Sequence, residues 1–149
     1  MRALLFDAGF DPWRIMADYQ AERSGLNGKY GALSVFVGSM RDFNLGDEVQ
    51  AMHLEHYPGM TEAQLELICR EAAERWPLLD ALVAHRVGAV APGEAIVLAA
   101  AWAEQRGDAC DACRYIVEGL KSRAPFWKRE VLRGGGSRWV AGNSDGYRK

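Results

Sequence analysis

The feature that most constrains the fold is the stretch EAIVLAAAWA, residues 94–103, which is apolar at consecutive positions. A strand with one face in water alternates apolar and polar residues, so a strand that is apolar on both faces belongs in the middle of a sheet. The stretch is also far shorter than the roughly 20 apolar residues needed to cross a bilayer. We therefore expect a central strand here and no membrane segment.

Strand-like and helical segments interleave along the rest of the chain. Helix starts are expected at Asp11 with Pro12 at the first helical position, at a Thr61–Gln64 capping box, and at Asp108. Several connections between strands are short, which favours antiparallel pairing and predicts an α+β fold. The expected strands are 2–6, 32–38, 49–57, 79–88, 94–103 and a short one within 134–141, and the expected helices are 11–23, 61–76 and 108–123.

Charge and cysteine content exclude several classes of protein. The chain has 18 Lys and Arg against 20 Asp and Glu, so it lacks the excess of cations that a dedicated nucleic-acid binder carries. Three cysteines do not make a disulfide framework, and the first residues lack the long apolar stretch of a signal peptide. We expect a single cytoplasmic domain over residues 1–149.

The segment LKSRAPFWKRE, residues 120–130, places four cations against one acid in a chain of net charge −2. Pro125 ends the preceding helix and allows Lys128 to fold back near Lys121, with two aromatic residues to anchor the turn. A site for a small anion would use this arrangement. An ordinary helix end followed by a loop would also produce it, because the helix dipole favours cations at a C-terminus.

Two patterns of possible metal ligands are weak. Cys110 and Cys113 form a single Cys-x-x-Cys pair, which cannot complete a four-thiolate zinc site and is read as small side chains in a helix. His53 and Glu55 share one face of a predicted strand while His56 points to the other. We therefore expect no metal.

Three further residues lie near the ends of predicted elements. His85 is close to a strand end and is expected at the surface. Arg41 follows a strand in a polar loop of the kind that often carries function. Arg106 lies in the loop before the last predicted helix.

Seven short segments stand out along roughly residues 30 to 140. They are NLGD (44–47), LEHYPGMTE (54–62), RWPL (75–78), HRVG (85–88), PGE (92–94), LKSRAPFWKRE (120–130) and RWV (138–140). Together they resemble the catalytic, large subunit of molybdopterin synthase, the MoaE family. The segments occur in family order, and two of the matching strings, LEHYPGM and RAPFWKRE, are long and unusual.

The resemblance implies an α/β-hammerhead fold and a sulfurtransferase of molybdenum cofactor biosynthesis. This family inserts two sulfurs into cyclic pyranopterin monophosphate to form the dithiolene of molybdopterin. Each sulfur arrives as a thiocarboxylate on the C-terminal Gly-Gly of a small ubiquitin-like subunit. The resemblance also implies a homodimer that binds two small subunits as a heterotetramer, with no metal or other cofactor. Two anions meeting in one pocket would explain the cluster of cations.

Carried over residue by residue, the resemblance places the essential lysine at Lys121, as nucleophile or acid–base group near the thiocarboxylate, and the second catalytic lysine at Lys128. It also implies that Arg75 reaches across the dimer. The substrate-binding positions that it implies are Ser39, Met40, Arg41, Arg75, Gln105, Arg106, Lys121, Lys128, Arg129 and Glu130.

The chain departs from the family pattern at two of these positions and in one loop. Ser39 stands where the family often has lysine, Gln105 stands where it has histidine, and the loop RGGGS (133–137) is longer than usual. An amide cannot replace an imidazole as a proton shuttle, so either the family histidine only binds or the base lies elsewhere here. A non-catalytic phosphate- or nucleotide-binding module and an inactive scaffold for the small subunit are the alternatives.

Overall fold

The structure, a computed structural model, describes residues 1–143, 146 and 147. Its elements are β1 (Arg2–Phe6), α1 (Pro12–Glu22), the 3-10 turn η1 (Ser24–Leu26), β2 (Ala32–Ser39), β3 (Phe43–Asn44), β4 (Asp47–His56), α2 (Met60–Arg75), β5 (Leu78–Arg86), β6 (Gly88–Val90), β7 (Ala95–Ala103), α3 (Arg106–Arg123), β8 (Phe126–Leu132) and β9 (Ser137–Val140).

The strands form two sheets. The first has the order β1-β5-β7-β2, and the second has the order β3-β4-β8-β9 with β6 paired to β4. β1 and β5 are parallel, whereas the other pairings among the described residues are antiparallel. The predicted α+β fold with largely antiparallel sheets is confirmed.

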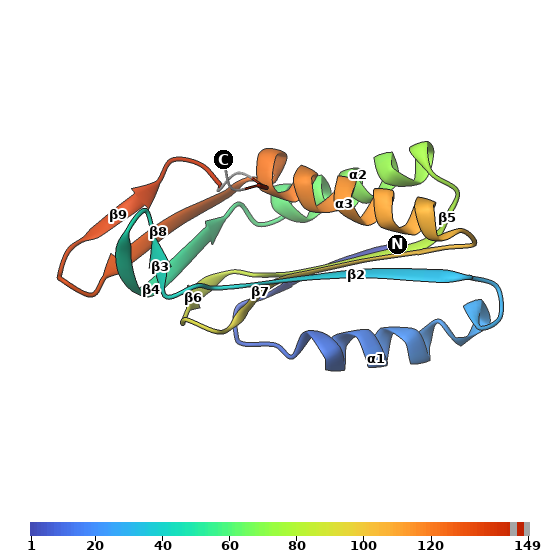
Figure 1. Ribbon diagram of the computed structural model, residues 1–149, viewed down its shortest axis with the longest axis horizontal. Coiled ribbons are helices and arrows are strands. Elements are labelled where there is room, and N and C mark those ends of the chain that lie inside the picture. The colour runs from blue at the N-terminus through green and yellow to red at the C-terminus, as the bar shows by residue number, and fades with distance from the viewer. Residues whose placement is uncertain (144–145, 148–149) are drawn as a thin grey trace.

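β7 is the central strand that the apolar stretch predicts. It pairs with β5 on one side and β2 on the other, and helices cover both faces of the sheet, α1 on one and α2 with α3 on the opposite one (Figure 1). Ala99 and Ala101 pack in the cluster under α2 and α3, whereas Ala100 and Trp102 pack in the cluster over α1. Consecutive positions are apolar because alternate side chains enter two different cores.

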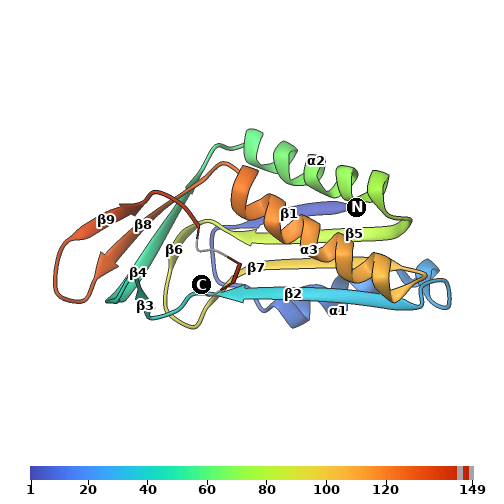
Figure 2. The ribbon, with the colours of Figure 1, turned by 45° about the horizontal axis from the view of Figure 1, so that its top comes forward.

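The second sheet lies beyond one end of the first, at the left of Figures 1 and 2. Its own small core contains Met52, Leu54 and Val90. β8 enters this sheet directly from α3 and runs between β4 and β9. The C-terminal end of α3 therefore meets the second sheet, and this junction positions the site described below.

The first helix begins as expected and the second does not. The Asp11 carboxylate accepts hydrogen bonds from the first turn of α1, with Pro12 at its start. The expected Thr61–Gln64 capping box is wrong, because α2 begins at Met60 with Gly59 as its N-cap. The Gly59 N–H donates to the Glu62 carboxylate at 2.7 Å, and Gly59 has a φ of +81°, which glycine adopts without strain.

The start of α3 also differs from the expectation. The helix begins at Arg106 with Gln105 as N-cap, so Asp108 is not the cap and Arg106 is not in a loop. Asp108 instead lies in the first turn, where the helix dipole favours an acid. The polar segment that starts at Arg41, expected as a loop, contains β3 and leads into the first residues of β4.

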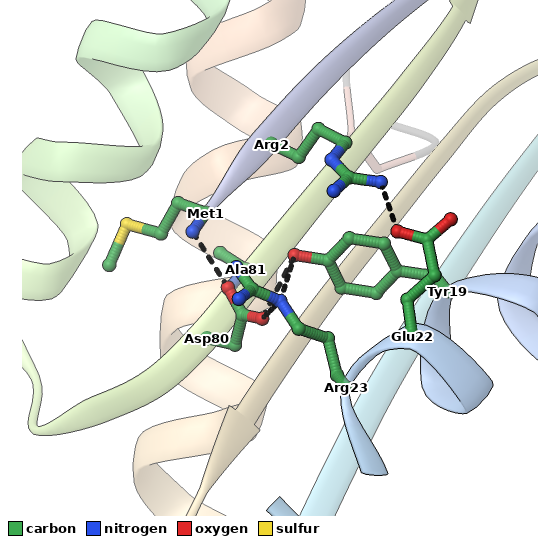
Figure 3. A network of polar contacts seen from close by, with 7 residues as sticks. All are labelled: Met1, Arg2, Tyr19, Glu22, Arg23, Asp80 and Ala81. Carbon is green, nitrogen blue, oxygen red and sulfur yellow. Dashed lines mark hydrogen bonds and ion pairs between the residues drawn. The ribbon is translucent and has the colours of Figure 1, made fainter. Parts of the chain in front are cut away.

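A polar network at one end of the first sheet ties β1 and α1 to β5 (Figure 3). The buried Asp80 carboxylate accepts a hydrogen bond from the Tyr19 hydroxyl at 2.9 Å and another from the backbone N–H of the next residue, Ala81, at 2.9 Å. It also pairs with Arg23 Nε at 2.9 Å and the Met1 amino group at 2.8 Å. Burial alone would raise the pKa of Asp80, but these contacts outweigh it and lower the pKa.

No helix in the described part of the chain is long and apolar enough to cross a membrane.

Candidate active site

Two adjoining cavities form where α3, β8 and the end of β2 meet. The larger, open cavity has a volume of about 540 Å³, and a narrow recess beside it has a volume of about 90 Å³. Lys121 from the last turn of α3 and Lys128 from β8 line both. The helix break at Pro125 thus brings the two lysines together as the sequence predicts.

Six of the predicted site residues line the open cavity. β2 and the segment after it contribute three of them, α3 contributes one, and β8 contributes two. These residues are Ser39, Met40, Arg41, Lys121, Lys128 and Glu130. Backbone hydrogen bonds fix the β2 end, since Met40 N–H donates to Glu94 O and Gly93 N–H donates to Met40 O.

Neither lysine forms an ion pair with an acid in the part of the chain that the structure describes. Glu130, 5% exposed, accepts from Asn44 Nδ2 at 3.0 and 3.2 Å and from Arg138 Nε at 3.1 Å, so its carboxylate is already engaged. Burial and then repulsion from Lys121 lower the pKa of Lys128 to about 8, against a smaller opposing attraction from Glu130. Two cations that lie close together and form no ion pair among the described residues are suited to binding an anion.

Two residues of the site were missed by the sequence reasoning. Asn143 accepts a hydrogen bond from Lys128 Nζ and donates one to the Lys121 carbonyl oxygen. Arg138 lines the open cavity and holds Glu130 in place. Asn143 lies in a polar tail with no pattern to single it out, whereas Arg138 was noticed only as part of a matching segment.

The expectation that His85 lies at the surface is wrong. The side chain is 7% exposed, lines the recess, and stacks on Phe126 with ring centroids 3.9 Å apart. Burial, with smaller contributions from Lys128 and Lys121, lowers its pKa to about 4 against the effect of a hydrogen bond to the Arg86 carbonyl. A signal was available, because residues 81, 83 and 85 alternate on one face of β5 and the first two are fully buried.

Four predicted site residues lie away from the cavities. Gln105 and Arg106 are exposed at the N-terminal end of α3, about 22 Å along the helix from Lys121. Arg129 points to the face of β8 opposite Lys128. Arg75 ends α2, with its guanidinium 4.4 Å from the centre of the Tyr115 ring. Within one chain these arginines do not join the lysines.

Sulfur and histidine ligands do not gather in the described residues. These residues contain no group of three or more His, Cys, Asp and Glu side chains that could hold a metal ion. Cys113 is buried on α3 and its burial raises the pKa of the thiol, while Cys110 is exposed. Neither cysteine lines the lysine cavities.

The sequence of this chain was compared with known protein families and with individual relatives. The sequence model described as MoaE protein matches residues 9–123. The chain is 47% identical to the molybdopterin synthase catalytic subunit of Pseudomonas aeruginosa over 135 residues, 91% of this chain and 87% of that protein. The chain belongs to the MoaE family. The resemblance of the seven short segments is confirmed, and so is the expectation of a sulfur-transferring enzyme subunit.

Solved MoaE structures share the fold. The MoaE protein of Burkholderia ambifaria is 43% identical, with a TM-score of 0.78 over 97% of this chain and 92% of that one. A chain from the complex of subunits 1 and 2 of the molybdopterin-converting factor of Helicobacter pylori matches with a TM-score of 0.76 and 22% identity, covering 93% of this chain and 90% of that chain. The α/β-hammerhead fold implied by the resemblance is confirmed.

Proposed function

We propose that this MoaE chain transfers two sulfurs from the C-terminal thiocarboxylate of a small ubiquitin-like subunit to cyclic pyranopterin monophosphate, forming the molybdopterin dithiolene. One observation carries the proposal most strongly, namely the half-buried lysine pair at the junction of the two cavities, which forms no ion pair with an acid among the described residues. The phosphate of the pterin substrate and the thiocarboxylate tail of the small subunit are both anions, and fixed cations are needed to bind both in one place.

The two cavities differ in size and polarity, and each is assigned a different ligand. The open cavity, with Arg41, Lys128 and Arg138 in its wall, has room for the pterin and its phosphate. The narrow recess beside Lys121 suits a slender group such as an extended glycine tail. When the thioacyl carbon is attacked, negative charge develops on its oxygen, and an ammonium held in place stabilises it. Lys121 is assigned to that carbon, and Lys128 to the substrate anion.

Three of the four residues outside the cavities fit the proposal only through a second subunit. Gln105 and Arg106 are too far along α3 to serve the lysines of their own chain, and Arg75 points elsewhere. In a homodimer each chain would lend these residues to its neighbour's cavity, and one small subunit would bind at each end. The unit is one cytoplasmic domain over residues 1–149, and no cofactor is required.

The direct test is sulfur transfer with purified components. A thiocarboxylated small subunit and the pyranopterin monophosphate are mixed with this chain, and dithiolene formation is followed by conversion to a fluorescent oxidised pterin. Transfer of two sulfurs per pterin is expected. Binding of both partners without transfer would overturn the proposal in favour of an anion-binding module or a scaffold.

The dimer has its own test. Mixed dimers of a Lys121→Ala chain and an Arg106→Ala chain contain one cavity with both residues intact, if Arg106 acts across the interface. Such mixtures should recover up to about a quarter of the wild-type activity when subunits exchange at random. Sedimentation should show a dimer for the free chain, and a monomer at micromolar concentration would contradict the assignment of Arg75, Gln105 and Arg106.

A further inference from the structure

His85 lines the recess and has one ring nitrogen with a defined role. Its Nδ1 lies 2.7 Å from the Arg86 carbonyl oxygen, which can only accept, so Nδ1 carries the hydrogen and Nε2 of the neutral ring carries the lone pair. Stacking on Phe126 at an interplanar angle of 13° holds the plane of the ring. Within the described chain, no hydrogen bond engages Nε2. Its lone pair is therefore oriented and available.

The groups around this ring keep it neutral. Its neighbours in register on β1 and β7 are Leu5 and Val97, which are apolar. The charged groups that face it are Lys121 from α3 and Lys128 from β8, and no carboxylate is among the described residues that line the recess. With a pKa of about 4, the ring carries no charge at neutral pH.

We propose that His85 is a positioning residue of the lysine pair, whose Nε2 serves as the neutral hydrogen-bond acceptor that orients the ammonium groups without cancelling their charge. The proposal rests on the function proposed above. A lysine ammonium sits on a flexible four-carbon stem and carries three N–H donors, so more than one acceptor is needed to fix its direction. Asn143 is one acceptor for Lys128, and His85 Nε2 is proposed as a second one at the recess. A carboxylate would fix it too, but would pair with the charge that the anionic substrates require. A buried imidazole that stays neutral avoids that competition.

Two substitutions of His85 distinguish the effect of the acceptor atom Nε2 from the effect of the aromatic ring. His85→Phe keeps an aromatic ring against Phe126 and removes the acceptor, whereas His85→Gln places an amide oxygen near the position of Nε2. In His85→Phe, the pKa of Lys128 should fall further below about 8, because an acceptor that stabilises the charged form is lost. The kcat for sulfur transfer should fall about tenfold or more, with a smaller change in KM. His85→Gln should recover most of both.

The readouts are the titration of labelled lysine side chains by NMR in the full-length chain and the steady-state kinetics. His53→Gln on β4 is the matched control, since His53 lines neither cavity and the change is chemically the same. It should leave the Lys128 titration and kcat unchanged. An unaltered Lys128 titration in folded His85→Phe, or a His85→Gln no closer to wild type than His85→Phe, overturns the proposal.

A folding defect does not remove the test. If His85→Phe fails to fold, His85→Asn replaces it, because an asparagine amide can still donate to the Arg86 carbonyl but does not reach the position of Nε2. It should lower the pKa of Lys128 as well, and an unchanged titration again contradicts the proposal. The titration needs no turnover, so a wild-type chain that transfers no sulfur refutes the proposed function while His85 is still decided by NMR.

Discussion

Asp80 and His85 lie five residues apart on β5, about 17 Å along the strand, and they stand at the centres of two opposite kinds of polar cluster. At the first, a buried acid is surrounded by an arginine, an amino group, a hydroxyl and a backbone N–H (Figure 3). At the second, two lysines face a neutral imidazole, and no acid pairs with them among the described residues.

The difference predicts that the first cluster contributes to stability and that the second binds an anion. The compensated acid has a lowered pKa, so the folded chain holds its charge more favourably than the unfolded chain and gains stability at neutral pH. The uncompensated Lys128 also has a lowered pKa, which for a cation means that the charged form is disfavoured by folding. An incoming anion relieves that cost, so the second cluster is prepared for a ligand.

The largest expected effect is on activity at the uncompensated end. Lys121→Ala should lower the rate of dithiolene formation by at least about 1000-fold, because it removes the group assigned to the reacting carbon. The free energy of unfolding should be unchanged or slightly higher, since Lys121 forms no ion pair in the described structure that could be lost.

Sulfur transfer and thermal unfolding of the same preparation check this prediction. Lys29→Ala is the control and should behave as wild type, because Lys29 is exposed and lines neither cavity. Near-normal turnover in Lys121→Ala would show that the lysine pair is not the reacting centre.

At the compensated end the expected effect is on stability. Asp80→Asn should lower the free energy of unfolding by about 2 kcal/mol, because hydrogen bonds to a charged group at a buried position are lost. The folded enzyme should keep its turnover. Asp18→Asn is the matched control, since its carboxylate is 63% exposed and pairs with Arg14 only at 3.4 Å, and it should change stability by less than about 0.5 kcal/mol.

The pH dependence sharpens the same contrast for Asp80. Its folded-state pKa lies below the ordinary value of 3.8, so its contribution is complete above that value and is lost as the pH falls through the folded-state pKa. The difference in unfolding free energy between wild type and Asp80→Asn should therefore shrink in acid. A difference that persists unchanged at pH 2 would mean that packing, and not charge, is what the substitution disturbs.

Lys128 should set an alkaline limit to catalysis. As the pH rises through about 8, the free enzyme loses this ammonium and kcat/KM should fall. Lys128→Arg should retain activity above that pH relative to its own maximum, because a guanidinium stays charged. The folded chain releases this proton before the unfolded chain does, so the stability of wild type should rise slightly between about pH 8 and the ordinary lysine pKa of 10.5.

Kinetics over about pH 6 to 10 check the predicted fall in kcat/KM, and unfolding measurements over the same range check the predicted rise in stability. A kcat/KM limb at the same pH in wild type and Lys128→Arg would assign the ionisation to another group.

The smallest expected effect concerns Gln105, which lies far from both clusters in its own chain. If this position only binds substrate in a neighbouring cavity, Gln105→His should change turnover by about 2- to 13-fold. That range corresponds to the free energy of one neutral hydrogen bond. A gain of about 100-fold or more, with a new ionisation near neutral pH, would show that the position houses a general base. Turnover of both forms across pH decides between the two.

Much of the fold could be predicted because its determinants are local. Consecutive apolar positions in 95–103 require two covered faces, and β7 has them. Asp11 followed by Pro12 specifies a helix start through bonds within one turn. The expected caps at Thr61 and Asp108 were wrong by a few positions, because a glycine with positive φ and an extended Gln105 begin those helices instead.

By itself the sequence determined the central strand, the helix break at Pro125 and the meeting of Lys121 with Lys128, since each depends on residues close together in the chain. Only the tertiary structure decided which polar groups are compensated. Asp80 meets Tyr19 and Arg23 through the packing of α1 on β5, and His85 meets the lysines through the packing of α3 and β8 against that strand. Residue type states what a side chain can accept or donate, but its partner is selected by strand order and helix placement, which join positions dozens of residues apart.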